Sequence, residues 1–404
     1  MLVIHRWRDR YADYAGYLDH ATHHVSYLTT SLGRESVPAE AAAVVVVDAT
    51  DDLAAVRGAA EALVARFGRP AALVALNEGD LDTAAVLRAE LGCPGRGPAE
   101  QDRFRDKLAM VSAAARAGVA VPAFADAPGP EAVREFGDRH GWPIVLKPRR
   151  GTASRGVRIL GSAAELDEAT AALADEPHLV QSYLPDPIVH IDGLWDGTAL
   201  GPWRASRYLN SCRAFNDGAY LGSVELDDPE LLAHLGEFTA RAVAALDPGP
   251  WVFHLEAFVA DSGAGTPRIT FLEAGARVGG AEIPFLWREV HGIDLMALAF
   301  DLQLGRPPAA VDPSFTESAG WLLAPLPVEA PCQVVEVSPA PDGPYAQVVP
   351  AEGAVIPKTG GYEHVGARFR FRGASSREVE AALERTAADF RLRCRPLPAP
   401  VPSH

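Results

Sequence analysis

The sequence predicts a multidomain protein that combines an α/β part with α+β parts. Three observations support this fold class. The first hundred residues alternate strand and helix patterns, the next eighty contain short strands around a glycine-bearing turn, and two apolar runs at 251–259 and 268–273 have the composition of a β-hairpin. A length of 404 residues is enough for two to four structural units with buried cores.

In residues 1–104 the pattern is that of a small parallel sheet. A buried strand is expected at 43–47, a helix at 51–67, a second strand at 72–76 and a helix at 81–91. Glu78 follows the second strand, at the end of a sheet where α/β proteins bind ligands, so it is a candidate substrate contact. A helix-capping role for Asn77 and Glu78 is the alternative.

Residues 105–185 predict an α+β unit built on antiparallel strands. Strands are expected at 143–147, 157–160 and 178–184, and helices at 106–118, 131–140 and 163–174. The turn Gly151–Gly156 lies between two of these strands, and Val157 stands where a Walker A loop requires lysine. A glycine-bearing hairpin loop can still close over phosphates with its backbone N–H groups. A basic surface turn is the alternative.

The most informative stretch is the predicted hairpin of residues 251–273. Its register places Glu256 opposite Glu273, on the face that carries His254 and Phe271. Facing Cβ atoms lie about 5 Å apart, so two carboxylates there need a cation, a shared proton or a displaced register. Arg277 and a glycine-rich segment follow, a combination that suits Mg²⁺ carrying phosphate. Two solvated glutamates on an edge hairpin are the alternative.

Residues 186–315 are expected to form a larger sheet unit, and residues 316–395 a β-rich unit. The latter has strands at 321–324, 333–337, 354–356 and 368–371 and a closing helix at 376–391, followed by a loose, proline-rich tail at 396–404. Arg207 lies in a polar and aromatic stretch that is either a substrate surface or an exposed strand and loop. His254 could orient Glu256, contact a substrate, or fill the sheet face.

Composition excludes several classes of protein. The chain is 48% hydrophobic and 22% charged, as in ordinary globular proteins. A net charge of −16 argues against binding nucleic acids or anionic membranes, and no apolar run approaches a membrane span. Four scattered cysteines without CxxC spacing, and an N-terminus without a secretory pattern, predict a reduced, cytoplasmic protein.

Taken in order along the chain, these features resemble the ATP-grasp enzymes. The resemblance rests on Lys107, on Lys147 with its glycine loop, on the strand ending at 180–184, and on Glu256 with the segment 273–277. It is closest to the carboxylate–amine ligase branch that includes the L-amino-acid (dipeptide) ligases. It covers about residues 70–310, while the two flanking parts match in position and size only.

The resemblance implies an ATP-grasp fold and its division into parts. Residues 1–104 would form a Rossmann-like pre-ATP-grasp domain, 105–185 the small ATP-grasp subdomain or lid, and 186–315 the large subdomain. Residues 316–395 would form a C-terminal β-rich domain, and 396–404 a flexible tail.

The resemblance also implies site residues and cofactors. ATP and one or two Mg²⁺ ions, for which Mn²⁺ can substitute, are the expected cofactors. Glu256 and Glu273 would hold the metal, and Arg277, Glu273 and Lys147 would be catalytic. The nucleotide would contact Lys107, Lys147, Ser154, Gly156, Gln181, Ser182, Tyr183, Leu184 and Asp192. The substrates would contact Glu78, Arg207, His254, Arg277 and Gly279.

Three positions depart from the common family pattern. Gln181 stands where an acidic hinge residue is frequent, and Ile188 where an acid usually grips ribose, so that Asp186 or Asp192 would serve instead. Gly275 occupies the place of a metal-binding asparagine, which leaves the second Mg²⁺ in question.

The function implied is an ATP-dependent ligase that forms an amide or peptide bond through an acyl phosphate and releases ADP and phosphate. Its partners would be small carboxylate and amine substrates, with no nucleic acid or membrane, and a homodimer is left open. Three alternatives stay open as well: a bicarbonate-activating carboxylase type, a hydroxyl kinase, and a non-catalytic ATP-sensing module.

Overall fold

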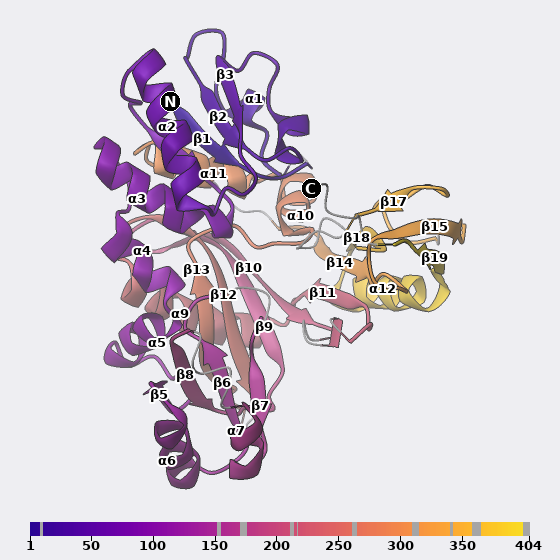
Figure 1. Ribbon diagram of the computed structural model, residues 1–404. Coiled ribbons are helices and arrows are strands. Elements are labelled where there is room, and N and C mark those ends of the chain that lie inside the picture. Colours follow the sequence, from indigo (N-terminus) through magenta and orange to yellow (C-terminus); the bar gives the residue numbers. More distant parts are fainter. Residues whose placement is uncertain are drawn as a thin grey trace. The chain divides into compact units, whose positions relative to one another are not determined.

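The computed structural model describes residues 1–8, 11–151, 155–169, 176–210, 214–215, 217–260, 265–308, 315–339, 342–357 and 365–398. The chain forms two compact units (Figure 1). The first comprises Met1–Trp203, Ala233–Val278 and Met296–Ala310, and the second comprises Arg204–Leu232, Gly279–Leu295 and Val311–His404. The finer domain boundaries implied by the resemblance stay a prediction.

The first unit begins with the predicted parallel sheet. Its strands are β1 (Leu2–His5), β2 (Ser26–Thr29), β3 (Ala43–Val46) and β4 (Leu73–Ala75), in the order β3-β2-β1-β4 with all pairings parallel. Its helical elements are α1 (Tyr14–Tyr17), η1 (Gly33–Ser36), α2 (Leu53–Phe67), η2 (Glu78–Asp80) and α3 (Leu81–Leu91). Leu28, Val56, Leu73 and Leu87 meet in its core, so the apolar faces of α2 and α3 cover the sheet.

One expectation for this sheet is wrong. The run 43–47 was expected to be a buried strand, but β3 is an edge strand that pairs with β2 alone. Val44 and Val46 are therefore 37% and 41% exposed. The two inner strands of the sheet are β2 and β1, and each has only four residues, too few to show a pattern in the sequence.

The small antiparallel sheet is confirmed. Its strands are β5 (Phe124–Ala127), β6 (Ile144–Pro148), β7 (Arg158–Leu160) and β8 (His178–Ser182), in the order β5-β8-β6-β7. The neighbouring helices are α4 (Pro98–Arg105), α5 (Lys107–Arg116), α6 (Pro130–His140) and α7 (Ala163–Ala169). Helix α4 is missing from the sequence prediction because its residues are mostly polar and give no apolar stripe.

The larger antiparallel sheet of the first unit carries the predicted hairpin. Its strands are β9 (Ile188–Trp195), β10 (Leu200–Tyr208), β12 (Trp251–Ala260) and β13 (Arg268–Gly275), in the order β13-β12-β9-β10. Helices α9 (Pro229–Leu246) and α11 (Leu295–Gln303) complete this part. The β9–β12 register is regular from Trp195 opposite Trp251 to Ile188 opposite Phe258.

The hairpin register confirms one expectation and corrects another. Glu256 lies opposite Glu273, as predicted. A β-bulge follows between Glu256 and Ala257, after which Ala257 pairs with Phe271. The expectation that Phe271 shares the face of His254 and Glu256 is therefore wrong, because a bulge changes the register by one residue and with it the face.

The second unit is β-rich. The end of β10 pairs with β11 (Leu221–Glu225), which is followed by β14 (Ser318–Ala324), β18 (Ala367–Gly373) and β16 (Ala346–Val348). A separate sheet has the order β17-β15-β19, with β17 at Val355–Ile356, β15 at Cys332–Val337 and β19 at Leu392–Pro396. Helices α10 (Ile283–Glu289) and α12 (Ser376–Asp389) belong to this unit. Strand β19 was not predicted, and it includes Pro396, the first residue of the expected tail.

None of the helices in the described parts of the chain is long and apolar enough to cross a lipid bilayer.

Gly193 on β9 gives a test of this fold. A Cβ atom at Gly193 would lie 2.6 Å from the carbonyl oxygen of Pro202 and 2.9 Å from the Cα atom of Trp203, both backbone atoms of β10. We expect Gly193→Ala to cost about 1–3 kcal/mol of unfolding free energy, because strands must move apart to admit the methyl group.

Gly58 is the matched control for this substitution. It lies in α2, and a Cβ atom there would meet nothing within 4 Å. Gly58→Ala should therefore raise the unfolding free energy by about 1 kcal/mol through helix propensity. Urea unfolding followed by circular dichroism checks both, and a Gly193→Ala midpoint equal to the wild type would contradict the close strand approach.

Candidate functional site

Strands β9, β12 and β13 present polar side chains on one face. Because paired residues of antiparallel strands point to the same side, the register defines two rows across this face. The first row is His190, Glu256 and Glu273, and the second is Asp192, His254 and Gly275. The intervening residues Ile191, Leu255 and Ala257 are fully buried on the opposite face, so the alternation separates site from core.

The two glutamates lie side by side with limited exposure. The side chain of Glu256 is 16% exposed and that of Glu273 is 39% exposed. The Nζ atom of Lys107 lies 3.7 Å from Oε2 of Glu273 and lessens the repulsion between the carboxylates. Carboxylate oxygens on neighbouring strands are the ligand type that Mg²⁺ takes from proteins, so the pair fits a divalent metal.

Three interactions fix the start of α5, where Lys107 lies. It is the first residue of α5, and the Asp106 side chain caps this helix by accepting from the N–H groups of Leu108 and Ala109. Asp106 also binds the Arg149 guanidinium at the end of β6. The Lys107 ammonium donates to the carbonyl oxygen of Gly151 at 2.8 Å, which ties it to the start of the glycine loop.

Helix α5 is also fixed to the strand that carries Glu273. The backbone N–H of Ala274 on β13 donates to Sδ of Met110 at 3.2 Å. Met110 lies one turn beyond Lys107, so this contact holds the lysine beside the glutamate pair.

Lys147 is a buried cation near both glutamates. It lies on β6 and is 4% exposed. Burial lowers the pKa of Lys147 to about 8, although the carboxylates of Glu273 and Glu256 act in the opposite direction. An anion entering the site would restore a full positive charge, so the residue is suited to a phosphate.

Arg277 and Glu78 form a close ion pair. The Nε and Nη2 atoms of Arg277 donate to Oε2 of Glu78 at 2.9 and 2.6 Å, and Arg105 donates to Oε1 at 2.6 Å. Burial alone would raise the pKa of Glu78, but the two guanidinium groups outweigh it and hold this pKa at about 2. Glu78 is therefore a charged carboxylate in the site, while Asn77 alone caps η2.

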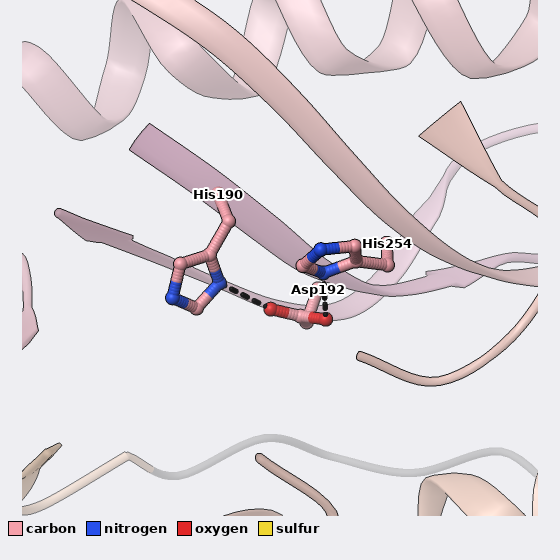
Figure 2. A group of neighbouring side chains, drawn as sticks. All are labelled: His190, Asp192 and His254. Carbon is pink, nitrogen blue, oxygen red and sulfur yellow. Dashed lines mark hydrogen bonds and ion pairs between the residues drawn. The ribbon is translucent and has the colours of Figure 1, made fainter. Parts of the chain in front are cut away.

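Asp192 binds two histidines, as Figure 2 shows. Nδ1 of His190 lies 2.6 Å from Oδ2 of Asp192, and Nδ1 of His254 lies 2.8 Å from Oδ1. Burial lowers the pKa of His254, but the Asp192 carboxylate more than offsets this and the pKa stands at about 9. Nε2 of His254 lies 3.8 Å from Oε1 of Glu256, so the cluster reaches the glutamate pair.

Several of these groups line one cavity. Charged and apolar side chains form its lining, together with two glycines. The lining residues are Glu78, Phe104, Arg105, Lys107, Met110, Gly151, His254, Glu273, Ala274, Gly275 and Arg277. The structure thus brings together predicted residues that are up to 199 positions apart in the chain.

Other predicted site residues lie elsewhere in the described chain. Gln181 is buried in β8, and Ser182, Tyr183 and Leu184 follow it at the end of that strand. Gly156 is exposed with φ +72°, and Ser154 lies outside the described residues. Their nucleotide contacts stay predictions.

Two predicted substrate residues belong to the second unit. Arg207 on β10 forms an ion pair with Glu380 of α12, and Gly279 begins a segment of that unit. The proposed substrate contacts of Arg207 and Gly279 stay predictions as well.

Sequence reasoning missed two residues of the site, Arg105 and His190. Arg105 is the last residue of α4, a helix whose sequence shows no apolar periodicity. Its position two residues before Lys107 could have indicated that it belongs to the same site. His190 stands two residues before Asp192, and this spacing places both side chains on one face of a strand.

No family model matches the chain. Over 96 residues it is 33% identical to pyruvate carboxylase of Bacillus subtilis, which covers 21% of the chain and 8% of that enzyme. Over 277 residues it is 24% identical to the large chain of carbamoyl phosphate synthase of Micrococcus luteus, which covers 66% of the chain and 24% of that protein. The chain thus spans a quarter or less of the length of these two relatives.

Solved structures resemble nearly the whole chain. L-amino acid ligase from Bacillus licheniformis matches with a TM-score of 0.75 and 18% identity, covering 97% of this chain and 98% of that one. Carboxyaminoimidazole ribonucleotide synthase from Aspergillus clavatus, solved with ATP, matches with a TM-score of 0.68 and 14% identity, covering 96% and 99%.

A third structure is the biotin carboxylase domain dimer of Hydrogenobacter thermophilus 2-oxoglutarate carboxylase, solved with MgADP, ADP and bicarbonate. It matches with a TM-score of 0.68 and 16% identity, covering 97% of this chain and 90% of that one. Together with the element order, these likenesses show that the chain has the ATP-grasp fold, as the sequence resemblance implied.

The Glu78–Arg277 pair predicts a pH-dependent contribution to stability. Because the folded pKa of Glu78 lies below its unfolded value of about 4.3, its contribution is present above pH 5 and is lost as the pH falls toward 2. We expect Glu78→Gln to lower the unfolding free energy by up to about 3 kcal/mol at pH 7, and by much less near pH 3.

Glu90 provides the control, because Arg57 donates to it through the same two nitrogen atoms, Nε and Nη2, but on the exposed surface. Glu90→Gln should change stability little at either pH. Urea midpoints at pH 7 and pH 3 measure both variants. A Glu78→Gln deficit that is the same at the two pH values would show that the carboxylate charge is not what stabilises the fold.

Proposed function

We propose that this protein is an ATP-dependent carboxylate–amine ligase that activates its acid substrate as an acyl phosphate. The observation that carries the proposal is the convergence of two facing carboxylates, Glu256 and Glu273, with three cations, Lys107, Lys147 and Arg277, in the first unit. Phosphoryl transfer requires this combination, since catalysis consists largely of positioning the phosphates and neutralising their charge.

ATP and Mg²⁺ are the cofactors that the site fits best. Glu256 and Glu273 would hold the metal, which would neutralise charge on the transferring phosphate. Lys107 and Lys147 would bind phosphate oxygens, and the backbone that starts at Gly151 would close over them. Support for this assignment comes from ATP-grasp structures that were solved with ATP and with MgADP.

The chemistry follows from the poor leaving ability of a carboxylate oxygen. A carboxylate oxygen of the substrate attacks the γ-phosphorus of ATP, and ADP departs. The amine then attacks the acyl carbon and loses a proton, and inorganic phosphate leaves with the former carboxylate oxygen. Arg277, which lines the cavity, would bind the negative charge that develops on the acyl phosphate.

The mixed charge of the cavity favours amino-acid substrates. The carboxylates of Glu78 and Glu273 and the guanidinium groups of Arg105 and Arg277 all line the cavity, and this mixture complements the two charges of an amino acid. Phe104 and Met110 add apolar wall for a side chain. The likeness to an L-amino acid ligase supports the same substrate class.

Bicarbonate activation is the second candidate. The similarity to pyruvate carboxylase and carbamoyl phosphate synthase, and a related fold solved with bicarbonate, favour it. It differs from the first candidate in requiring bicarbonate for nucleotide cleavage.

A screen of paired amino acids for phosphate release tests the proposal. We expect ADP and phosphate to form in step with an amide product, and carboxylate ¹⁸O to appear in the phosphate, one atom per turnover. Phosphate release that depends on bicarbonate alone would favour the second candidate. AMP, or unlabelled phosphate during confirmed amide synthesis, would rule out the acyl-phosphate route.

The metal assignment has its own test. Glu256→Gln and Glu273→Gln should each lower Mg²⁺-dependent turnover by at least about 100-fold, because each removes a charged oxygen ligand. The circular dichroism spectrum should stay unchanged, since neither side chain is part of an apolar core. Normal turnover in both variants at limiting Mg²⁺ would show that the metal binds elsewhere.

A further inference from the structure

The carboxylate of Asp192 is buried and bound at both of its oxygen atoms. Its side chain is 3% exposed, and each oxygen accepts from a different histidine ring. With both oxygens held, the carboxylate cannot rotate about its terminal bond. Asp192 and His254 are also direct cross-strand partners, so their spacing is set by the β9–β12 ladder.

His254 connects Asp192 to Glu256. Its Nδ1 atom faces Asp192 at 2.8 Å, and its Nε2 atom, on the other side of the ring, lies 3.8 Å from Oε1 of Glu256. The ring thus stands between two carboxylates, with one nitrogen facing each of them. The contact with Asp192 fixes the orientation of the His254 ring, and this orientation determines which ring nitrogen faces the Glu256 carboxylate.

A transition metal is the alternative occupant of this cluster, because two histidines and an aspartate form a familiar donor set. The distances argue against it. With bonds of about 2.1 Å, tetrahedral geometry separates neighbouring donor atoms by roughly 3.4 Å. The observed separations of 2.6 and 2.8 Å are hydrogen-bond lengths, so the three residues bind one another directly.

We propose that Asp192 is a positioning residue that acts through His254 to orient the carboxylate of Glu256 toward the metal site. His190 completes the arrangement by holding the second oxygen of Asp192. The proposal rests on the proposed metal-binding role of Glu256, and it gives Asp192 a role other than ribose contact. Residues that orient a ligand in this way commonly change metal affinity by 10–100-fold.

A direct measurement of metal binding tests the positioning role of Asp192 without measuring ligase activity. Mn²⁺ binding would be followed by electron paramagnetic resonance at a fixed concentration of a non-hydrolysable ATP analogue. We expect Asp192→Asn to weaken the protein-bound Mn²⁺ by about 10-fold or more. Asp167→Asn, which breaks an exposed pair with Arg134, is the matched control and should leave Mn²⁺ affinity unchanged.

Imidazole resonances of the wild-type protein provide a second readout that needs no variant. Long-range ¹H–¹⁵N spectra should show a proton on Nδ1 of His254 and on Nδ1 of His190, the two nitrogens that face Asp192. Should Asp192→Asn fail to fold, His254→Gln serves as a second variant and should weaken Mn²⁺ binding in the same way.

Unchanged Mn²⁺ affinity in folded Asp192→Asn would overturn the proposal, as would a His254 ring that carries no proton on Nδ1. Absence of protein-bound Mn²⁺ in the wild type would overturn it together with the metal site. Tight Zn²⁺ binding that is lost in His190→Ala would show that the three residues form a transition-metal site, and the positioning role of Asp192 would be rejected. If Asp192→Asn weakens Mn²⁺ binding but the wild type forms no amide product, the positioning role of Asp192 is supported and the proposed function fails.

Discussion

Two negative charges held on neighbouring strands constrain the rest of the first unit. Hydrogen bonds of the β12–β13 ladder fix Glu256 opposite Glu273, so the backbone cannot move the carboxylates apart to relieve their repulsion. Positive charge must therefore come from other segments of the chain. Lys107 and Lys147 provide it, and the N-terminal cap of α5 and the burial of β6 serve to hold these cations near the pair.

Charge balance also links the parallel sheet to the cavity that Glu78, Arg105 and Arg277 line. Glu78 is the first residue of η2, just after β4, and it lies between Arg105 and Arg277. Arg105 is at the end of α4, and Arg277 follows β13. A carboxylate already bound to Arg277 orients the guanidinium, and it is also a group that an incoming anion must accommodate. The same carboxylate thus connects the stability of the unit with the binding of its ligands.

The sequence was sufficient to predict the glutamate pair and the cations, because their positions follow from strand periodicity and from the order of motifs along the chain. It was not sufficient for His190. The spacing of His190 and Asp192 shows that they share a face, but only the pairing of β9 with β12 brings that face to His254. The exposed edge strand β3 and the bulge after Glu256 were missed for the same reason, since strand order and register depend on contacts between distant segments.

The alternation along β9 and β12 limits how this site can change. Asp192 and His254 face the site, while their neighbours Ile191 and Leu255 are fully buried on the reverse side. Inserting or deleting one residue in either strand would exchange the two sets, placing charges in the core and apolar groups in the site. New specificities can therefore arise by substitution within these strands, whereas changes of length are confined to the connections between them.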